Sequence, residues 1–469
     1  MKIRFCPLVV LVLTGCVRYH ARPLSPDAAA QAFAARTLED DGLRRFVAAA
    51  QRQQVTQWPP VTWGLSELTL AAFYYSPDLD VARAQWAVAR AATQTAGERP
   101  NPTLSLGPGA NATTRAPTGW IALVGLDIPI ETAGKRGHRR AQAGHLAEAA
   151  RQAVATMAWQ VRGRVRSGLV ALFAAREGLA QNAQLAERGA ENARILERQF
   201  QAGAISAFER TQARIIADNA QLAGEDAKRL EAESRLTLAE AVGVPASALC
   251  AVTVSFDGLA LSPEPPTLEK ARSTALLGRA DVLAALEEYA ASQSALQLEI
   301  ARQYPDIHLG PGYEYDQGDS KWSLGLAFDL PVFHRNGGAI AEATAKRGEA
   351  AARFTALQAR IVADVDRSLA GYRAAIEKQS VAEAMLGRIE KQEARARAML
   401  AVGEISRSEL LGLQVELSAQ ALARLDAVTK SLQALGALEE ALQTTLGVPE
   451  TTWLESTRVQ RSGMGGEQP

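Results

Sequence analysis

Histidine and cysteine are scarce in this chain of 469 residues, which contains five histidines and three cysteines. Metal-centred enzymes take many of their ligands from these two residue types, so little material for such a centre is present. The formal net charge is zero, which argues against a strong electrostatic field for nucleic acid. Serine, histidine and aspartate form no nucleophile motif, and no glycine-rich phosphate loop precedes a helix. We therefore predict no enzyme, no catalytic residues, no metal site and no nucleic-acid partner.

The N-terminus is predicted to be a lipoprotein signal peptide covering residues 1–15. A short basic region precedes an apolar run, 7–13, which is too short to span a bilayer as a helix. The sequence Leu13-Thr14-Gly15-Cys16 then matches a lipobox, at which bacterial lipoproteins are cleaved before the cysteine and acylated on it. An ordinary secretory signal with an incidental cysteine is the alternative. Val17 follows, where an aspartate would retain a lipoprotein at the inner membrane, so the outer membrane is favoured.

A covalent lipid on Cys16 is the one attached group that the sequence predicts. Several acyl chains, at roughly 0.8 kcal/mol per buried CH₂, would anchor the protein firmly. Maturation would leave Cys250 alone, so no intramolecular disulfide is expected. Beyond the signal, no stretch of about 18 uncharged apolar residues is present, so any crossing of the membrane must use strands.

The chain is internally duplicated, with markers that recur in the same order roughly 200 positions later. This period is too long for a solenoid repeat and indicates two similar halves. The recurring pairs are Leu106–Gly109 with Leu309–Gly312, Asp127–Pro129 with Asp329–Pro331, Gly203–Ser206 with Gly403–Ser406, and Gly243–Pro245 with Gly447–Pro449.

This duplication divides the chain into repeats and flanking segments. One helix near 28–54 is expected within the N-terminal extension. The predicted divisions are a lipidated extension over 16–62, a first repeat over 63–250, a linker over 251–265, a second repeat over 266–450 and a disordered C-terminal tail over 451–469.

Each repeat is predicted to contain a β-hairpin, a very long helix and a shorter return helix. A long helix of about 63 residues would measure about 95 Å, and two shorter helices stacked end to end would match it. We therefore expect a mainly α-helical barrel of coiled-coil hairpins, with the strands together at one end. The ranges are hairpin 103–128, long helix 138–201 and return helix 206–242, followed by hairpin 306–330, long helix 339–401 and return helix 406–446.

The strands of the second hairpin alternate between apolar and polar or small residues. A strand over 321–330, after a turn over 316–320, would put Trp322, Leu324 and Leu326 on one face. Alternation over nine or ten residues is typical of a transmembrane strand with a watery lumen, and also of a hairpin on a soluble core. Trp120, Trp322, Tyr313 and Tyr315 are candidates for interfacial aromatic girdles.

Four strands per chain cannot close a transmembrane barrel, and an open strand edge is not tolerated in lipid. Several chains must therefore contribute strands if the hairpins cross a membrane. Three chains would supply twelve strands, and four chains would also close. We predict a homotrimer with a twelve-stranded β-barrel.

The ordered set of duplicated hairpins and Gly-x-x-Ser-x-x-Glu turns resembles the TolC-like outer membrane factors. The resemblance covers about 66–449, and Asp127–Ile130 with Gly134–Arg136 resembles the heavy-metal branch. It implies a trimeric exit duct in the bacterial outer membrane with a long periplasmic extension. It also implies a periplasmic adaptor protein and an inner-membrane pump of the resistance-nodulation-division type as partners.

The resemblance assigns the helical turns to a periplasmic tip that contacts the adaptor. Glu409 falls where the family carries an acidic residue of the entrance constriction, while Gly412 replaces the second acidic position. Capping of its own helix is the alternative role for Glu409. The halves differ at the tips, with Ala204 in one and Glu404 in the other, and there we expect the gate. The residues assigned to adaptor contact are Gly203, Ser206, Glu209, Gly403 and Ser406.

The leading hypothesis is a passive duct of a tripartite efflux system that carries heavy-metal cations or drugs. A duct for type I protein secretion and a lipid-tethered coiled-coil scaffold remain alternatives. The scaffold would explain the helices and the lipobox, but not the paired hairpins at matched positions.

Overall fold

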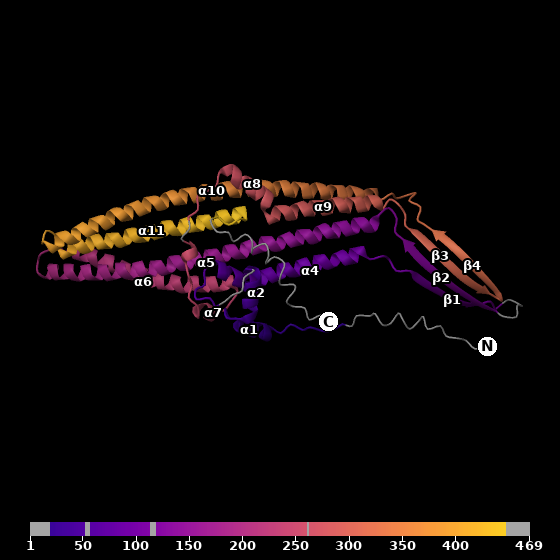
Figure 1. Cartoon of the computed structure of the whole chain (residues 1–469), viewed down its shortest axis with the longest axis horizontal. Helices are drawn as coiled ribbons and strands as arrows, with labels where there is room; N and C mark the ends of the chain where they lie inside the picture. The colour runs from indigo at the N-terminus through magenta and orange to yellow at the C-terminus, as the bar shows by residue number, and fades with distance from the viewer. Residues whose placement is uncertain (1–18, 52–56, 113–118, 260–261, 447–469) are drawn as a thin grey trace.

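The computed structural model describes residues 19–51, 57–112, 119–259 and 262–446. The molecule is a long layer of antiparallel helices that ends in a four-stranded sheet (Figure 1). Cys16 and the expected disordered tail, 451–469, lie outside the described residues. The helices of the layer are α4 (Pro77–Gly97), α5 (Lys135–Gln201), α6 (Ala207–Val242), α9 (Ala280–Ala301), α10 (Gly337–Ala401) and α11 (Arg407–Leu442).

The layer has a definite order with two free edges. Helix α5 contacts α4 and α6 on one side and α9 and α11 on the other, and α10 packs beyond α9 and α11. Figure 1 shows α4 in line with α6, and α9 in line with α11. Helices α4 and α6, of 21 and 36 residues, thus lie end to end beside α5 of 67 residues, which confirms the predicted stacking of two shorter helices beside a long one. No helix in the described ranges is both long and apolar enough to cross a membrane.

The sheet repeats the order of the helix layer, because each long helix continues from a strand. Its antiparallel order is β1-β2-β3-β4, so β1 and β4 are the outer strands. Strand β1 follows α4, β2 leads into α5, β3 follows α9 and β4 precedes α10. The strands are β1 (Thr103–Ala110), β2 (Trp120–Ile130), β3 (Ile307–Asp316) and β4 (Asp319–Ala327).

The register of the strands separates an apolar face from a polar one. Residues that face each other across antiparallel strands lie on the same face. Leu106 pairs with Val124, and Tyr313 pairs with Trp322 at 4.8 Å between ring centroids. On the other face Gly125 pairs with Gly312, and Glu314 pairs with Lys321. The predicted alternation of β3 and β4 is therefore present, whereas β2 places Ile121 and Leu123 on the otherwise polar face.

The predicted bounds of the second hairpin were wrong by several residues. Its turn is the dipeptide Gln317-Gly318, with φ of 52° and 117°, instead of the expected 316–320. Two left-handed residues suit a tight hairpin because their twist matches the strands. Strand β4 therefore starts at Asp319. It ends at Ala327, which pairs with His308, because β3 begins only one residue before that partner and offers little further backbone for pairing. In the first hairpin β2 runs through Pro129, which pairs with His308, to Ile130.

The bounds of the long and return helices also differ from prediction. The long helices begin at Lys135 and Gly337 instead of 138 and 339, each after a residue with positive φ. The first return helix ends at Val242 as predicted, before Gly243 with φ of 83°. The second ends at Leu442 instead of 446, because Gln443 takes the left-handed position. The Gln443 side chain then accepts a hydrogen bond from the backbone N–H of Ala280 at 2.8 Å.

Smaller elements lie beside the middle of the layer, and all of them except α1 bury residues there. The expected single helix near 28–54 is two helices, because Leu38 turns into the core and Asp40 caps the second one. The middle elements are α1 (Pro26–Ala34), α2 (Asp41–Gln51), α3 (Leu65–Tyr75), α7 (Ala246–Cys250), the 3₁₀ helix η2 (Asp257–Leu259) and α8 (Leu268–Gly278).

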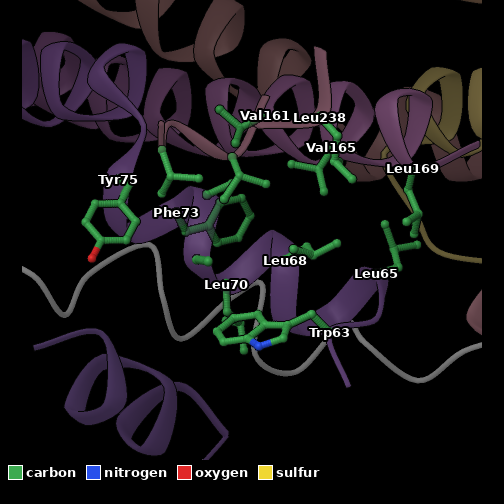
Figure 2. Close-up of a cluster of buried hydrophobic side chains, with 14 of the residues drawn as sticks. Trp63, Leu65, Leu68, Leu70, Phe73, Tyr75, Val161, Val165, Leu169 and Leu238 are labelled. Carbon is green, nitrogen blue, oxygen red and sulfur yellow. The ribbon is translucent and has the colours of Figure 1, made fainter. Parts of the chain in front are cut away.

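The main hydrophobic core lies where α3 meets α5 and α6 (Figure 2). Leu68 and Phe73 of α3 pack against Val161 and Val165 of α5 and Leu238 of α6. A Cβ on Gly168 would meet the Leu238 backbone at 3.2 Å, so this glycine permits the close approach of α5 and α6. Further toward the tip, small residues at every seventh position of α6 face α5 and continue that contact. These are Ala213, Ala220, Ala227 and Ser234.

Replacing Val165 with alanine tests this core. The side chain is 0 % exposed, so loss of two methyl groups should lower the free energy of unfolding by about 2 kcal/mol. Val61 is 71 % exposed, and Val61→Ala is the matched control with little expected effect. Thermal unfolding followed by circular dichroism in detergent measures both. Equal melting temperatures for the two variants would contradict this assignment of the core.

Candidate functional site

Two helical tips lie together at the end of the molecule opposite the sheet (Figure 1). One tip joins α5 to α6 and the other joins α10 to α11, at equivalent positions of the two repeats. All the residues predicted for adaptor contact or for an entrance lie in these turns. The tips are therefore the candidate functional site, together with the polar face of the sheet.

The first tip begins with a helix end closed by Gly203. This residue has φ of 72°, and its N–H donates to the Phe200 carbonyl at 2.9 Å. The next N–H, of Ala204, donates to the Gln199 carbonyl at 2.8 Å. This pair of bonds is a Schellman motif, in which glycine is favoured because it has no Cβ.

The second tip has the same geometry. Gly403 has φ of 81°, and its N–H donates to Leu400 at 3.1 Å. The Glu404 N–H donates to the Met399 carbonyl at 2.9 Å. The exposed Glu404 side chain therefore marks a difference in charge between two turns of equal backbone structure.

Each return helix begins with a complete capping box. The Glu209 N–H donates to Ser206 Oγ at 3.2 Å, while Ser206 N–H and Oγ–H both donate to Glu209 Oε2 at 2.8 Å. In the second tip, Ser406 donates to Glu409 Oε2 at 2.7 Å from its N–H and 2.8 Å from its hydroxyl. Both serine–glutamate pairs therefore cap their own helices, which is the alternative role that the sequence offered for Glu409.

The capping box lowers the pKa of Glu209 and of Glu409. Hydrogen bonds from the backbone N–H and then the hydroxyl of the capping serine stabilise the charged carboxylate in both tips. Both carboxylates are therefore ionised at neutral pH. Glu409 is thus an exposed, charged residue whose Oε2 is held by its own helix cap.

Polar contacts join the two hairpins just behind the tips. Arg407, the first residue of α11, contacts Glu191 of α5 at 3.0 Å. Arg188 of α5 donates to the Gln414 carbonyl at 3.1 Å and to Ser418 Oγ at 2.7 Å on α11. These contacts connect the first repeat to the second within one chain.

Glu393 of α10 is a buried carboxylate in the same region. Burial would raise its pKa, but hydrogen bonds from Gln414 and Arg397 outweigh that effect and hold the pKa below its usual value. Sequence reasoning missed this residue and the arginine–glutamate contact. The sequence did contain a signal for Glu393. Apolar residues at 386, 389, 396 and 400 are spaced three, four or seven apart, which predicts the buried face of a helix, and Glu393 falls on that face.

No arrangement for metal binding is found in the described ranges. Among these residues, no group of three or more histidine, cysteine, aspartate or glutamate side chains could hold a metal ion. His145 contacts Glu287 at 2.7 Å, and His308 contacts both oxygens of Asp127 at 3.0 Å. The predicted lipid site, Cys16, lies outside the described residues.

The capping boxes predict a pH-dependent tip. Because the folded-state pKa of Glu209 and Glu409 is lowered, their contribution to stability is full above the ordinary value of 4.5. It is lost as the pH falls below 4.5 through the lowered folded-state pKa. Hydrogen–deuterium exchange of the tip peptides, corrected for intrinsic rates, should show their protection falling there. Ser206→Ala should weaken the first tip alone at pH 7, and pH-independent protection in both tips would contradict the prediction.

Comparison with known proteins places this geometry in a family. The family described as "Outer membrane efflux protein" matches residues 71–244 and 271–444, once in each repeat. The cobalt-zinc-cadmium resistance protein CzcC of Cupriavidus metallidurans is 28% identical over 215 residues. That match covers 45% of this chain and 50% of the relative, so the chain spans half the length of CzcC.

Solved structures of channels share the fold. CusC superposes with a TM-score of 0.66 at 17% identity, over 84% of this chain and 95% of its own. The CmeC outer membrane channel of Campylobacter jejuni gives a TM-score of 0.63 at 17% identity, over 90% of each chain. The family match covers most of the sequence and falls on both repeats. The chain therefore belongs to the outer membrane efflux protein family.

Proposed function

We propose that three copies of this chain form a closed tube that acts as the outer membrane channel of a tripartite efflux system. The observation that carries the proposal is that the helix layer and the sheet share one order and each has two free edges. A head-to-tail ring of copies would join α10 of one copy to α4 and α6 of the next. The same rotation would join β4 to the next β1 and satisfy both strand edges.

The two faces of the sheet suit a membrane barrel. Exposed Leu104, Leu106, Leu324 and Leu326 lie on the apolar face, which would contact lipid. Glycine, serine and charged residues make up most of the other face, together with Ile121 and Leu123 of β2, and this face would line a watery lumen. Three chains supply twelve strands and four would supply sixteen. The proposed ring of three would have six nearly equivalent units, because each chain contributes two halves.

The N-terminal lipid would hold this tube in the outer membrane. Acylation of Cys16 anchors the extension, while the helical layer reaches into the periplasm. The membrane attachment would therefore have two parts, the lipid and the barrel, which can be separated experimentally.

The tips would form the periplasmic entrance and the contact with an adaptor protein. Gly203, Ser206, Glu209, Gly403 and Ser406 build two rigid turns of matched shape, which suits a repeated partner surface. Glu409 would place one carboxylate per chain at the constriction, giving a ring that favours cations. The contact between Arg407 and Glu191 would hold the hairpins of one chain together in the closed state. We expect the gate to involve Glu404, which distinguishes the second tip from the first.

Heavy-metal cations are the proposed cargo, with drugs as the second candidate. The support is the resemblance to a protein named for cobalt, zinc and cadmium resistance. Energy would come from an inner-membrane pump of the resistance-nodulation-division type, reached through the adaptor. A duct for type I protein secretion would use the same fold with a different pump.

Membrane extraction distinguishes this channel from a lipid-tethered periplasmic scaffold. We expect Cys16→Ala protein to remain in the membrane fraction after washing with carbonate and to need detergent, because the strands still span the bilayer. Wild-type protein is the control for both lipid and barrel. Release of the variant into the aqueous wash would refute the barrel and support the scaffold.

Loss of the protein should sensitise cells to its cargo. We expect a deletion strain to lose growth at concentrations of cobalt, zinc or cadmium that the parent tolerates, and a plasmid copy to restore it. Dose–response curves with the cations and with a panel of drugs measure the effect. A fall in drug tolerance alone would overturn the metal assignment and leave the channel assignment in place.

A further inference from the structure

The N-terminal helix α1 is ordered without any buried residue of its own. It has nine residues, a serine cap at Ser25 and an alanine-rich sequence, and Phe33 is 45 % exposed. Helices of this length are marginal in water unless their apolar residues pack against another surface. The Arg36 guanidinium lies 5.2 Å from the centroid of the Phe33 ring, but no residue of α1 is buried by the described part of this chain. This exposure points to a contact outside the single copy.

Arg36 fixes the position of α1 relative to the helix layer. Its guanidinium donates to the Gly243 carbonyl at 2.7 Å and to the Tyr75 carbonyl at 3.1 Å. The Tyr75 hydroxyl in turn donates to the Thr37 carbonyl at 2.7 Å. These bonds hold the end of α1 at the break between α3 and α4. Figure 1 places α1 on the edge of the molecule opposite α8 and α10.

The opposite edge carries an exposed leucine at the equivalent position of the second repeat. The break between α8 and α9, at Arg279, corresponds to the break between α3 and α4, at Ser76. Leu277 of α8 therefore corresponds to Tyr74 of α3. Phe46 of α2 covers Tyr74, with 5.7 Å between the ring centroids, whereas Leu277 is 76 % exposed. The second repeat lacks a covering helix among the described residues.

A head-to-tail ring would bring these two features together at one height. In such a ring the two repeats are related by rotation about the axis of the tube. The equivalent breaks, at Ser76 and Arg279, would therefore lie at the same height along that axis. The edge with α1 would then meet the edge with α8 of the next copy. We propose that α1 packs through Phe33 against Leu277 of the next copy, so that the N-terminal extension is a strap between subunits. This inference rests on the proposed ring of copies.

Disulfide cross-linking between engineered cysteines tests the strap. In a Cys250→Ser background, Phe33→Cys combined with Leu277→Cys should give reducible dimers and trimers in oxidised outer membrane vesicles. Each single variant should stay monomeric on a denaturing gel. Phe33→Cys with Phe208→Cys is the matched control, because Phe208 is 74 % exposed but lies in the distant tip.

The outcomes separate the strap from the proposed function. Native mass measurement of the detergent-extracted protein reports the ring independently of the cross-link. A trimer without linked chains would overturn the strap alone, and a monomer would overturn both. A cross-link within one chain would also overturn the strap.

The C-terminal residues 447–469, outside the described part of the chain, are the other candidate cover for Leu277. Maleimide labelling of Leu277→Cys in a chain ending at Leu446 distinguishes the two covers. Continued protection supports α1. Labelling as fast as that of an exposed cysteine only after this truncation would overturn the strap.

Discussion

The two free edges of the chain impose the constraint on which the rest of the structure depends. Strands β1 and β4 each have one hydrogen-bonded neighbour, and a strand edge cannot face lipid unpaired. The helix layer also has two unpaired edges, because α6 and α10 each pack against neighbouring helices of the layer on one side only. Phe208, Ile215 and Leu222 are exposed at every seventh position of α6, a spacing suited to a neighbouring helix. The single rotation of the proposed ring would satisfy both requirements.

The two repeats pack against each other within one helix layer. Helix α5 of the first repeat lies between elements of both repeats, and buried Arg162 contacts Glu439 of α11 at 2.9 Å. The two repeats also differ in the hydrogen bonds made at the break between their shorter helices, which lies between α3 and α4 in the first and between α8 and α9 in the second. In the second, Arg279 at the break donates to the Ala441 carbonyl at 2.6 Å. In the first, Ser76 occupies that position and Arg36 of the extension supplies the guanidinium. The extension therefore replaces a contact that the second repeat provides for itself.

Local rules in the sequence predicted most of the fold because they act over a few residues. Recurring markers gave the duplication, and Ser206 with Glu209 gave the start of α6 to within one residue. Predictions failed where a distant segment decides the boundary. Strand β4 ends opposite the first residues of β3, and α11 ends where Gln443 binds the start of α9. The break after Ala34 depends on Leu38 entering a core formed mainly by α3, α5 and α6. At the tips, the caps were predictable, whereas the contact of Arg407 with Glu191 requires knowledge of which helices are neighbours.

The distribution of hydrogen bonds indicates how a tube of this kind can change shape at one end. Each tip closes its backbone bonds within itself, through the Schellman motif and the capping box. A movement that opened a tip internally would lose those bonds, whereas movement of one hairpin past the other keeps them. The contacts between hairpins are exposed or partly exposed, and exposed ion pairs stabilise by about 0–1 kcal/mol. The lower cost of breaking them favours rigid tips that move as units.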